Sequence, residues 1–236
     1  MTPSICVAVL TCRRPGPLRA LLCDIRERAT QFAGQVAVRV YDDATPVPEF
    51  CGLGGVRYMR SAVRHGKHYH WHWMRCIFRD LRTTAADYYI VLQDDLRLCS
   101  DFFNRALAVW QGIEDPKISL TLSALSGRYE KPNWTNVVAE HLGDVWYTGW
   151  VDGFYLCERA FFEALEFEVY PVWRNWIQQP LLGSGVGAQL SRRLLAQEHQ
   201  MFGVHRSLAY TTDAPSVMNP AEREIHTCHS IRHIDS

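Results

Sequence analysis

The sequence has no long apolar run, no cysteine pair in CxxC spacing and no excess of charge of either sign. A membrane-spanning helix needs about 20 consecutive apolar residues, and the 236-residue chain contains no such stretch. The apolar run at residues 5–10 is too short for a signal peptide, and no cleavage pattern follows it. We therefore expect a soluble, cytoplasmic protein without a membrane anchor.

Cysteine is present, but its spacing favours neither a disulfide framework nor a zinc site. Eight cysteines are spread along the chain, several of them in apolar stretches where a free thiol behaves as a small hydrophobe. Reduced thiols are the simplest interpretation. Two histidine clusters, at 68–72 and 226–233, lack nearby cysteine pairs. On a helix the first cluster would also diverge, so we predict no zinc site in either.

The balance of charge argues against non-specific binding to nucleic acid or to an anionic membrane. Lysine and arginine together number 25, as do aspartate and glutamate, so the formal net charge is zero. One local basic run is present and leaves attraction for phosphate open. It contains a single acid, Asp80, among the cations Arg57, Arg60, Arg64, Lys67, Arg75, Arg79 and Arg82.

Strand and helix patterns alternate over the first half of the chain. Short β-branched or apolar runs predict strands at 5–10, 36–41, 56–59, 88–92 and 118–123. Apolar residues at helical spacing predict helices after Pro15, over 71–81 and over 103–110. This order predicts an α/β fold with a mostly parallel central sheet flanked by helices.

The second half is less regular. We expect a long loop or insertion over 126–149, a strand over 150–157, a short helix over 158–165, a loop over 170–187 and a helix from Val186. The economical interpretation is one domain over 1–236, with a nucleotide-binding half (1–123) and a loop-rich acceptor half with its tail (124–236).

The adjacent acids Asp94 and Asp95 are the strongest candidate site. The apolar strand at 88–92 runs directly into them, and two buried carboxylates need a compensating charge. Mn²⁺ or Mg²⁺ would suit, because hard cations bind carboxylate and phosphate oxygens together. On strand alternation the two side chains point in opposite directions, and we predict Asp95 as the direct ligand. The alternative is a solvated strand end or a helix cap before Asp101.

The stretch VLQDDLRLCSDFF resembles the segment around the modified DXD motif of GT-A glycosyltransferases, and is most similar to N-acetylglucosaminyltransferase I. Other segments resemble the family in the same order: VAVLTCRRP, VYDDAT, Arg64 to Lys67, WVDGFYLCERAFFEAL and YPVWRNWIQQP. Together these matches span roughly residues 5–205, and their order makes the resemblance specific. Soluble family 2-like relatives include viral enzymes that glycosylate hydroxymethylated bases in DNA.

The resemblance implies a Rossmann-like GT-A fold and metal-dependent transfer of a sugar, of hexosyl or N-acetylhexosaminyl type, from a nucleotide-sugar donor to a hydroxyl. UDP-sugar is the expected donor, and modified DNA is one candidate acceptor. The donor-binding candidates are Thr11, Arg13, Asp42, Asp43, Lys67, Asp94 and Trp150, and the metal candidates are Asp95 and His205. Each also has a structural alternative: a turn for Asp42 and Asp43, surface solubility for the cations, and packing for Trp150 and His205.

The catalytic base is the weakest part of the resemblance. Arg174 and Asn175 stand where the inverting relative has acids, and neither can deprotonate a sugar hydroxyl at neutral pH. Asp152 is our first substitute and Asp144 the second, and a structural acid beside Gly153 is an equal alternative for Asp152. A retaining reaction would need no such base.

Two other function classes remain open. A nucleotidyltransferase also uses strand-end acids and a metal, but should carry a glycine-rich basic loop after the first strand, where this chain has only Gly16. A non-catalytic sugar- or nucleotide-binding domain would explain Arg174 and Asn175. Release of nucleotide from a sugar nucleotide separates an enzyme from a binding domain.

Overall fold

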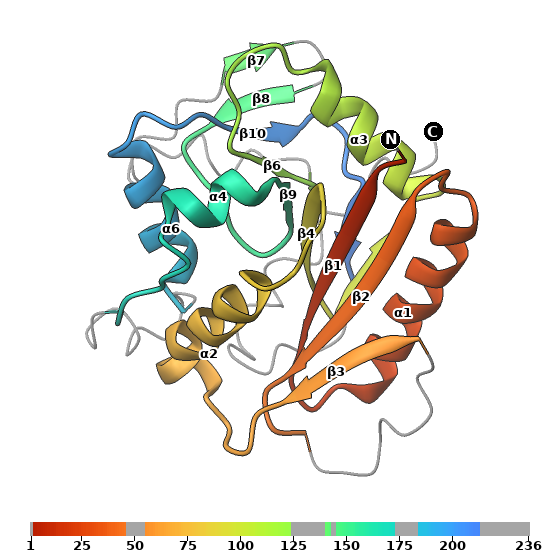
Figure 1. The fold of residues 1–236 in the computed structure, drawn as a ribbon, viewed down its shortest axis with the longest axis vertical. Helices are drawn as coiled ribbons and strands as arrows, with labels where there is room; N and C mark the ends of the chain where they lie inside the picture. Colours follow the sequence, from red (N-terminus) through yellow and green to blue (C-terminus); the bar gives the residue numbers. More distant parts are fainter. Residues whose placement is uncertain (1, 46–54, 124–139, 143–144, 173–183, 213–236) are drawn as a thin grey trace.

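Strands and helices alternate along the chain, as the sequence pattern predicts (Figure 1). The computed structural model describes residues 2–45, 55–123, 140–142, 145–172 and 184–212. The strands are β1 (Ser4–Thr11), β2 (Gln35–Asp42), β3 (Val56–Arg60), β4 (Tyr88–Gln93), β5 (Leu96–Leu98), β6 (Ser119–Thr121), β7 (Glu140–Leu142), β8 (Val145–Thr148), β9 (Tyr155–Cys157), β10 (Met201–Val204) and β11 (Ala209–Thr211). The helices are α1 (Pro15–Thr30), α2 (Gly66–Leu81), α3 (Phe102–Gly112), α4 (Arg159–Ala164) and α6 (Val186–Leu195).

One large mixed sheet organises the described residues. Its strand order is β3-β2-β1-β4-β9-β6-β10-β8-β7, and β11 pairs with β5 in a separate ribbon. Strands β3, β2, β1 and β4 are mutually parallel, as are β6 and β10, whereas β9 runs antiparallel between β4 and β6. The predicted fold class, a mostly parallel central sheet flanked by helices, is confirmed.

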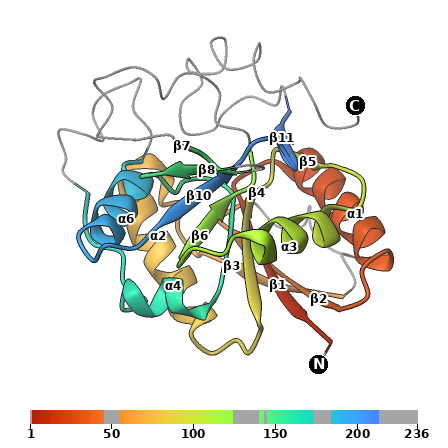
Figure 2. The same ribbon diagram turned by 90° about the horizontal axis from the view of Figure 1, so that it is seen from above.

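Each face of the sheet carries its own hydrophobic core. Along β1, Ile5, Val7 and Val9 pack with residues of α1 and α3, whereas Cys6 and Ala8 pack with residues of α2, α4 and α6. Figure 2 shows these two groups of helices on opposite sides of β1 and β4. A strand covered on both faces must be apolar at consecutive positions, which explains the continuous run at residues 5–10.

Helix α1 shows how the local sequence sets an element. Pro15 occupies its first position, where the missing N–H costs no hydrogen bond. Leu18, Leu21, Leu22 and Ile25 recur on one face and are buried. Burial of each such side chain contributes about 1.5–3 kcal/mol relative to an exposed one.

No helix among the described residues is both long and apolar enough to cross a membrane.

The helix expected over 71–81 is confirmed and begins earlier, at Gly66, so His68, His70 and His72 lie on it. Two other expectations for individual elements were wrong. The strand expected over 150–157 is confined to β9, because Gly153 bends the chain with φ of +72°. Strands β7 and β8 lie inside the segment expected to be irregular, where β8 pairs with β10. The loops expected at 126–139 and 173–183 lie outside the described residues.

The strand order places a topological switch point beside β1. The chain leaves β1 through α1 to β2 on one side, and returns from β3 through α2 to β4 on the other. Ligands of open α/β sheets bind outside the carboxyl ends of the strands at such a point, because the diverging connections leave a crevice there. The residues that follow β1 and β4 are therefore the first place to look for a site.

Candidate active site

The acidic pair lies in the two-residue turn between β4 and β5. The Asp94 N–H donates to the Leu10 carbonyl at 2.9 Å, which joins the turn to the end of β1. The Asp95 carbonyl accepts from the Thr212 N–H at 2.7 Å, just after β11. Both aspartates have 0% of their surface exposed. Two adjacent acids are thus buried at the switch point that the sheet order defines.

Arg14 binds both of these acids. Its Nε donates to Asp94 Oδ2 at 3.2 Å and its Nη2 to Asp94 Oδ1, while Nη1 donates to Asp95 Oδ2 at 3.1 Å. The expectation that the two side chains point in opposite directions was wrong. The strand ends at Gln93, so the two-residue alternation no longer applies, and both carboxylates reach the same guanidinium.

The burial of Asp94 and Asp95 explains why the positively charged Arg14 side chain lies beside them. Burial raises the pKa of Asp94, while the Arg14 guanidinium and the hydrogen bond from Thr11 act in the opposite direction. Thr11 is itself buried and donates from Oγ1 to Asp94 Oδ2 at 2.6 Å. Thr11 therefore orients Asp94, whereas the sequence analysis assigned it to the donor.

Arg14, which the sequence analysis did not single out, bonds the acidic pair, whereas Arg13 does not reach it in the contacts described above. Arg13 is exposed, has a left-handed backbone with φ of 55°, and donates its N–H to Thr45 Oγ1 at 2.7 Å. Arg14 is the functional residue that sequence reasoning missed. The signal was Pro15, because a proline in the first helical position makes the preceding residue the helix cap beside the strand end.

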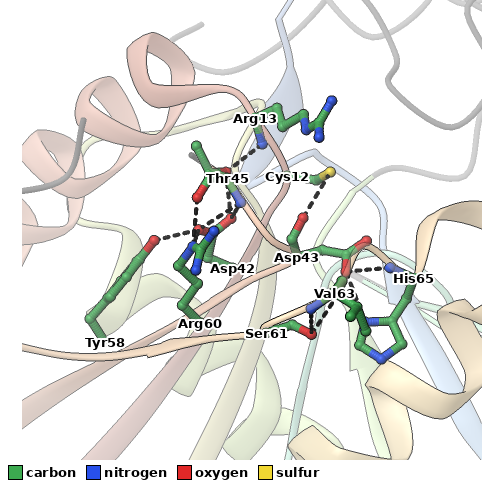
Figure 3. Close-up of polar contacts among 10 residues, drawn as sticks. All are labelled: Cys12, Arg13, Asp42, Asp43, Thr45, Tyr58, Arg60, Ser61, Val63 and His65. Carbon is green, nitrogen blue, oxygen red and sulfur yellow. Dashed lines mark hydrogen bonds and ion pairs between the residues drawn. The ribbon is translucent and has the colours of Figure 1, made fainter. Parts of the chain in front are cut away.

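Asp42, at the end of β2, organises the turn that follows it (Figure 3). Its carboxylate accepts from the Thr45 N–H, from Thr45 Oγ1 at 2.5 Å and from the Tyr58 hydroxyl. Burial and the bond to Asp42 raise the pKa of Tyr58, which keeps its hydroxyl a donor. Arg60 lies 4.0 Å from Asp42 Oδ2. Asp42 is fully buried, so its carboxylate stabilises the loop at Thr45 from inside the protein.

Asp43 holds the start of α2 in the same view (Figure 3). Its carboxylate accepts from the His65 N–H at 2.7 Å, the His65 ring Nδ1 at 2.8 Å and the Gly66 N–H at 2.8 Å. The His65 ring in turn stacks on His72 and Trp73, with centroids 5.3 and 5.2 Å apart. These contacts tie the ends of β1, β2 and α2 into one preorganised edge.

Asp152 lies in the bend before β9 and is exposed. A Cβ built on Gly153 would lie 3.5 Å from Gln93 Nε2, so this bend adjoins the residue before the acidic pair. A Cβ built on Gly187 would lie 2.5 Å from Asp152 Cγ. Gly187 is the second residue of α6, so the Asp152 carboxylate rests against the positive end of that helix.

The remaining candidates are scattered around the carboxyl edge. Trp150 is half-buried and donates its N–H to Thr148 Oγ1 at 3.1 Å, and Lys67 is half-buried near the start of α2. His205 is exposed after β10, and its Nδ1 accepts from Trp146 Nε1 at 3.0 Å. Asp144, Arg174 and Asn175 lie outside the described residues, as does the histidine cluster at 226–233.

The ligand atoms at the acidic pair suit a divalent cation only in part. Asp94 and Asp95 supply the hard oxygen ligands that Mg²⁺ and Mn²⁺ prefer, but in this structure three of their four carboxylate oxygens accept hydrogen bonds from Arg14. Strands β9 and β6 lie between β4, which precedes Asp95, and β10, which precedes His205, and shared binding of a metal by these two residues stays a prediction. Within the described ranges, no three His, Cys, Asp or Glu side chains form a metal-binding group.

Comparison with known proteins identifies the fold but not the family. No family model matches the chain, and no curated protein matches it. Glucosyl-3-phosphoglycerate synthase from Mycobacterium tuberculosis, solved with Mg²⁺ and uridine diphosphate, has a TM-score of 0.57 at 14% identity. The alignment covers 90% of this chain and 73% of that one. The S. aureus TarS fragment 1–349 has a TM-score of 0.54 at 10% identity, covering 90% of this chain and 61% of that fragment.

This chain thus spans less than two thirds of the TarS fragment. At these identities the likeness concerns architecture alone. The chain has the GT-A type of α/β fold, with its buried acidic pair and Arg14 at the switch point between β1 and β4.

Proposed function

We propose that this protein transfers a sugar from a nucleotide-sugar donor, most naturally a UDP-sugar, to an acceptor hydroxyl. The observation that carries the proposal is the buried cluster of Asp94, Asp95 and Arg14 at the switch point of a GT-A sheet. A similar fold has been solved with Mg²⁺ and uridine diphosphate, which supports a nucleotide diphosphate as the ligand. Ligands of such sheets bind at this edge.

The donor side would be formed by the ends of β1, β2 and β4. Arg14 and Lys67 can offer positive charge to the diphosphate, and Trp150 a ring for stacking. Direct contacts of Asp42 and Asp43 with the ribose or the base stay predictions. Both carboxylates are engaged inside the protein, so their first effect is to shape the loop at Thr45 and the start of α2.

Asp152 is the candidate base on the acceptor side. It is exposed and adjoins Gln93, next to the acidic pair. A carboxylate placed beside the acceptor can accept a proton from a sugar hydroxyl in an inverting reaction. Asp144 stays the second candidate. Whether the transferred group is a hexose or an N-acetylhexosamine is left to the donor screen below.

The acceptor is best sought first among small hydroxyl compounds. Several cations of the basic run are already engaged: Arg57 bonds Asp80, Arg60 bonds the Thr45 carbonyl and Arg79 bonds Glu168. These contacts inside the protein leave fewer arginine side chains to bind DNA phosphates. Neutralisation of those phosphates dominates non-specific affinity for DNA. A hydroxymethylated base in DNA is therefore kept as a separate acceptor to test.

Dependence on Mn²⁺ or Mg²⁺ remains part of the proposal. Asp95, with Asp94 beside it, would hold the ion once Arg14 gives way, and the ion would neutralise the departing diphosphate. The chain's own residues would do the rest: Thr11 orients Asp94, and Arg14 stays near the phosphates.

The test is a screen of UDP-sugars for UDP release, with Mn²⁺, Mg²⁺ or chelator, and with free sugars or hydroxymethylated DNA as acceptors. We expect metal-stimulated release from at least one UDP-sugar. UDP binding without release from any donor would indicate a non-catalytic binding domain. Pyrophosphate formation from UTP and a sugar 1-phosphate would indicate a nucleotidyltransferase, and no interaction with any nucleotide would refute the proposal.

A further inference from the structure

We propose that Arg14 is an internal counter-ion that excludes a divalent cation from Asp94 and Asp95 until a nucleotide diphosphate draws its guanidinium away. Binding of the cation and of the nucleotide would then be coupled through one side chain. This inference rests on the proposed function for the nucleotide, but the competition between Arg14 and the cation can be measured without it.

The first support is that Arg14 uses three of the four carboxylate oxygens that a cation would need. Both Asp94 oxygens and Asp95 Oδ2 accept from the guanidinium, and Thr11 also occupies Asp94 Oδ2. The side chains of both acids have no exposed surface, whereas 16% of the Arg14 side chain is exposed. A cation approaching from solvent therefore meets the arginine before it meets a carboxylate.

The second support is the charge that remains. Two carboxylates and one guanidinium leave a formal net charge of minus one in a buried cluster. Arg14 therefore holds the acids in the free protein without fully neutralising them. The arrangement still attracts a cation once the guanidinium moves, which a fully neutralised cluster would not do.

The third support is that the backbone of Arg14 is held separately from its guanidinium. Its carbonyl accepts from the Leu18 N–H at 3.1 Å, so α1 fixes the backbone, while the guanidinium bonds the two acids. Pro15 and Pro17 have no N–H, so the start of α1 offers few amides to a phosphate. The guanidinium, with its forked donors, is the group here that suits a diphosphate.

Calorimetric titration of Mn²⁺ into the protein without nucleotide tests the competition. We expect weak binding to the wild type and binding about 10- to 100-fold tighter to Arg14→Ala, the range that corresponds to losing hydrogen bonds to a charged group. Arg26→Ala, which removes an exposed arginine from the same helix, should bind Mn²⁺ as the wild type does. Equal Mn²⁺ affinity for the wild type and Arg14→Ala would overturn the inference.

Titration at saturating UDP tests the coupling. The wild type should bind Mn²⁺ about 10- to 100-fold tighter with UDP than without it, with the reciprocal gain for UDP, and Arg14→Ala should lose most of this gain. Arg14→Gln, of similar size but uncharged, covers the case in which the alanine variant fails to fold. UDP binding that is indifferent to Mn²⁺ would overturn the inference. Absence of UDP binding under every condition would instead refute the proposed function.

Discussion

The donor edge and the acceptor side of this sheet are built in different ways. At the donor edge, formed by the ends of β1, β2 and β4, the acids Asp42, Asp43, Asp94 and Asp95 are all buried and bonded to the protein. On the acceptor side the candidate base Asp152 is exposed. A buried, bonded acid fixes geometry in advance, whereas an exposed acid can exchange protons with a ligand. Under the proposed function, the first region recognises the donor and the second transfers the proton.

The largest expected effect is on the donor edge. Asp94→Ala should destabilise the fold by about 3 kcal/mol, because it removes the acceptor of two Arg14 hydrogen bonds and of the Thr11 hydroxyl inside the protein. Urea denaturation measures the change, and Asp115→Ala, at an exposed acid, should cause none that is measurable. An equal response of the two variants would mean that the buried cluster contributes nothing to the stability of this edge.

The next effect is on the acceptor side. Asp152→Asn should lower the turnover number by about 100-fold while the affinity for UDP stays unchanged, as for loss of a general base. Steady-state kinetics and calorimetry separate the two quantities. Glu163→Gln, an exposed acid on α4, is the matched control. Unchanged turnover in Asp152→Asn would make Asp152 a structural residue and leave Asp144 as the candidate.

A smaller effect should follow from moving Asp152 without altering it. Gly187→Ala places a methyl group about where the Asp152 carboxylate lies, so that side chain must shift. We expect turnover to fall about tenfold, as for a misplaced catalytic group, and the melting temperature to fall as well, because the added methyl group also lies 2.7 Å from Asp152 Cβ. Gly112→Ala, where an added Cβ meets nothing within 4 Å, is the control. Full activity in Gly187→Ala would argue against a precise position for Asp152.

The smallest effect concerns pH at the donor edge. Burial lowers the pKa of His70 from 6.5 to about 4, with Asp43 acting against the shift and His65 adding to it. Between these values the folded state binds fewer protons than the unfolded state, so stability falls as pH drops from 6.5 towards 4. The stability of His70→Gln should therefore fall less over this pH range than the stability of the wild type.

Denaturation at a series of pH values measures that difference. His68→Gln, at an exposed histidine of the same helix, should retain the wild-type slope. A His70→Gln variant with the wild-type slope would show that the acid sensitivity of the edge arises elsewhere.

Much of the fold could be predicted because its signals are local. The apolar runs of β1 and β4, and the Pro15 start of α1 with its leucine spacing, each specify an element within a few residues. The elements that were mispredicted depend on distant partners. Strand β8 is defined by pairing with β10, and the bend at Gly153 by packing beside Gln93.

The candidate site also has one part that the local sequence predicts and one part that only the tertiary structure decides. From residue order alone, the acidic pair could be placed at the end of a buried strand, because a strand and its end are neighbours in the chain. Nothing in the order of residues distinguishes Arg13 from Arg14, two adjacent arginines of equal charge. The tertiary structure separates them: Arg13 turns outward with φ of 55°, and Arg14 reaches acids 80 and 81 positions away. Periodicity is a property of one segment, whereas ion pairing at a switch point requires two distant segments to meet.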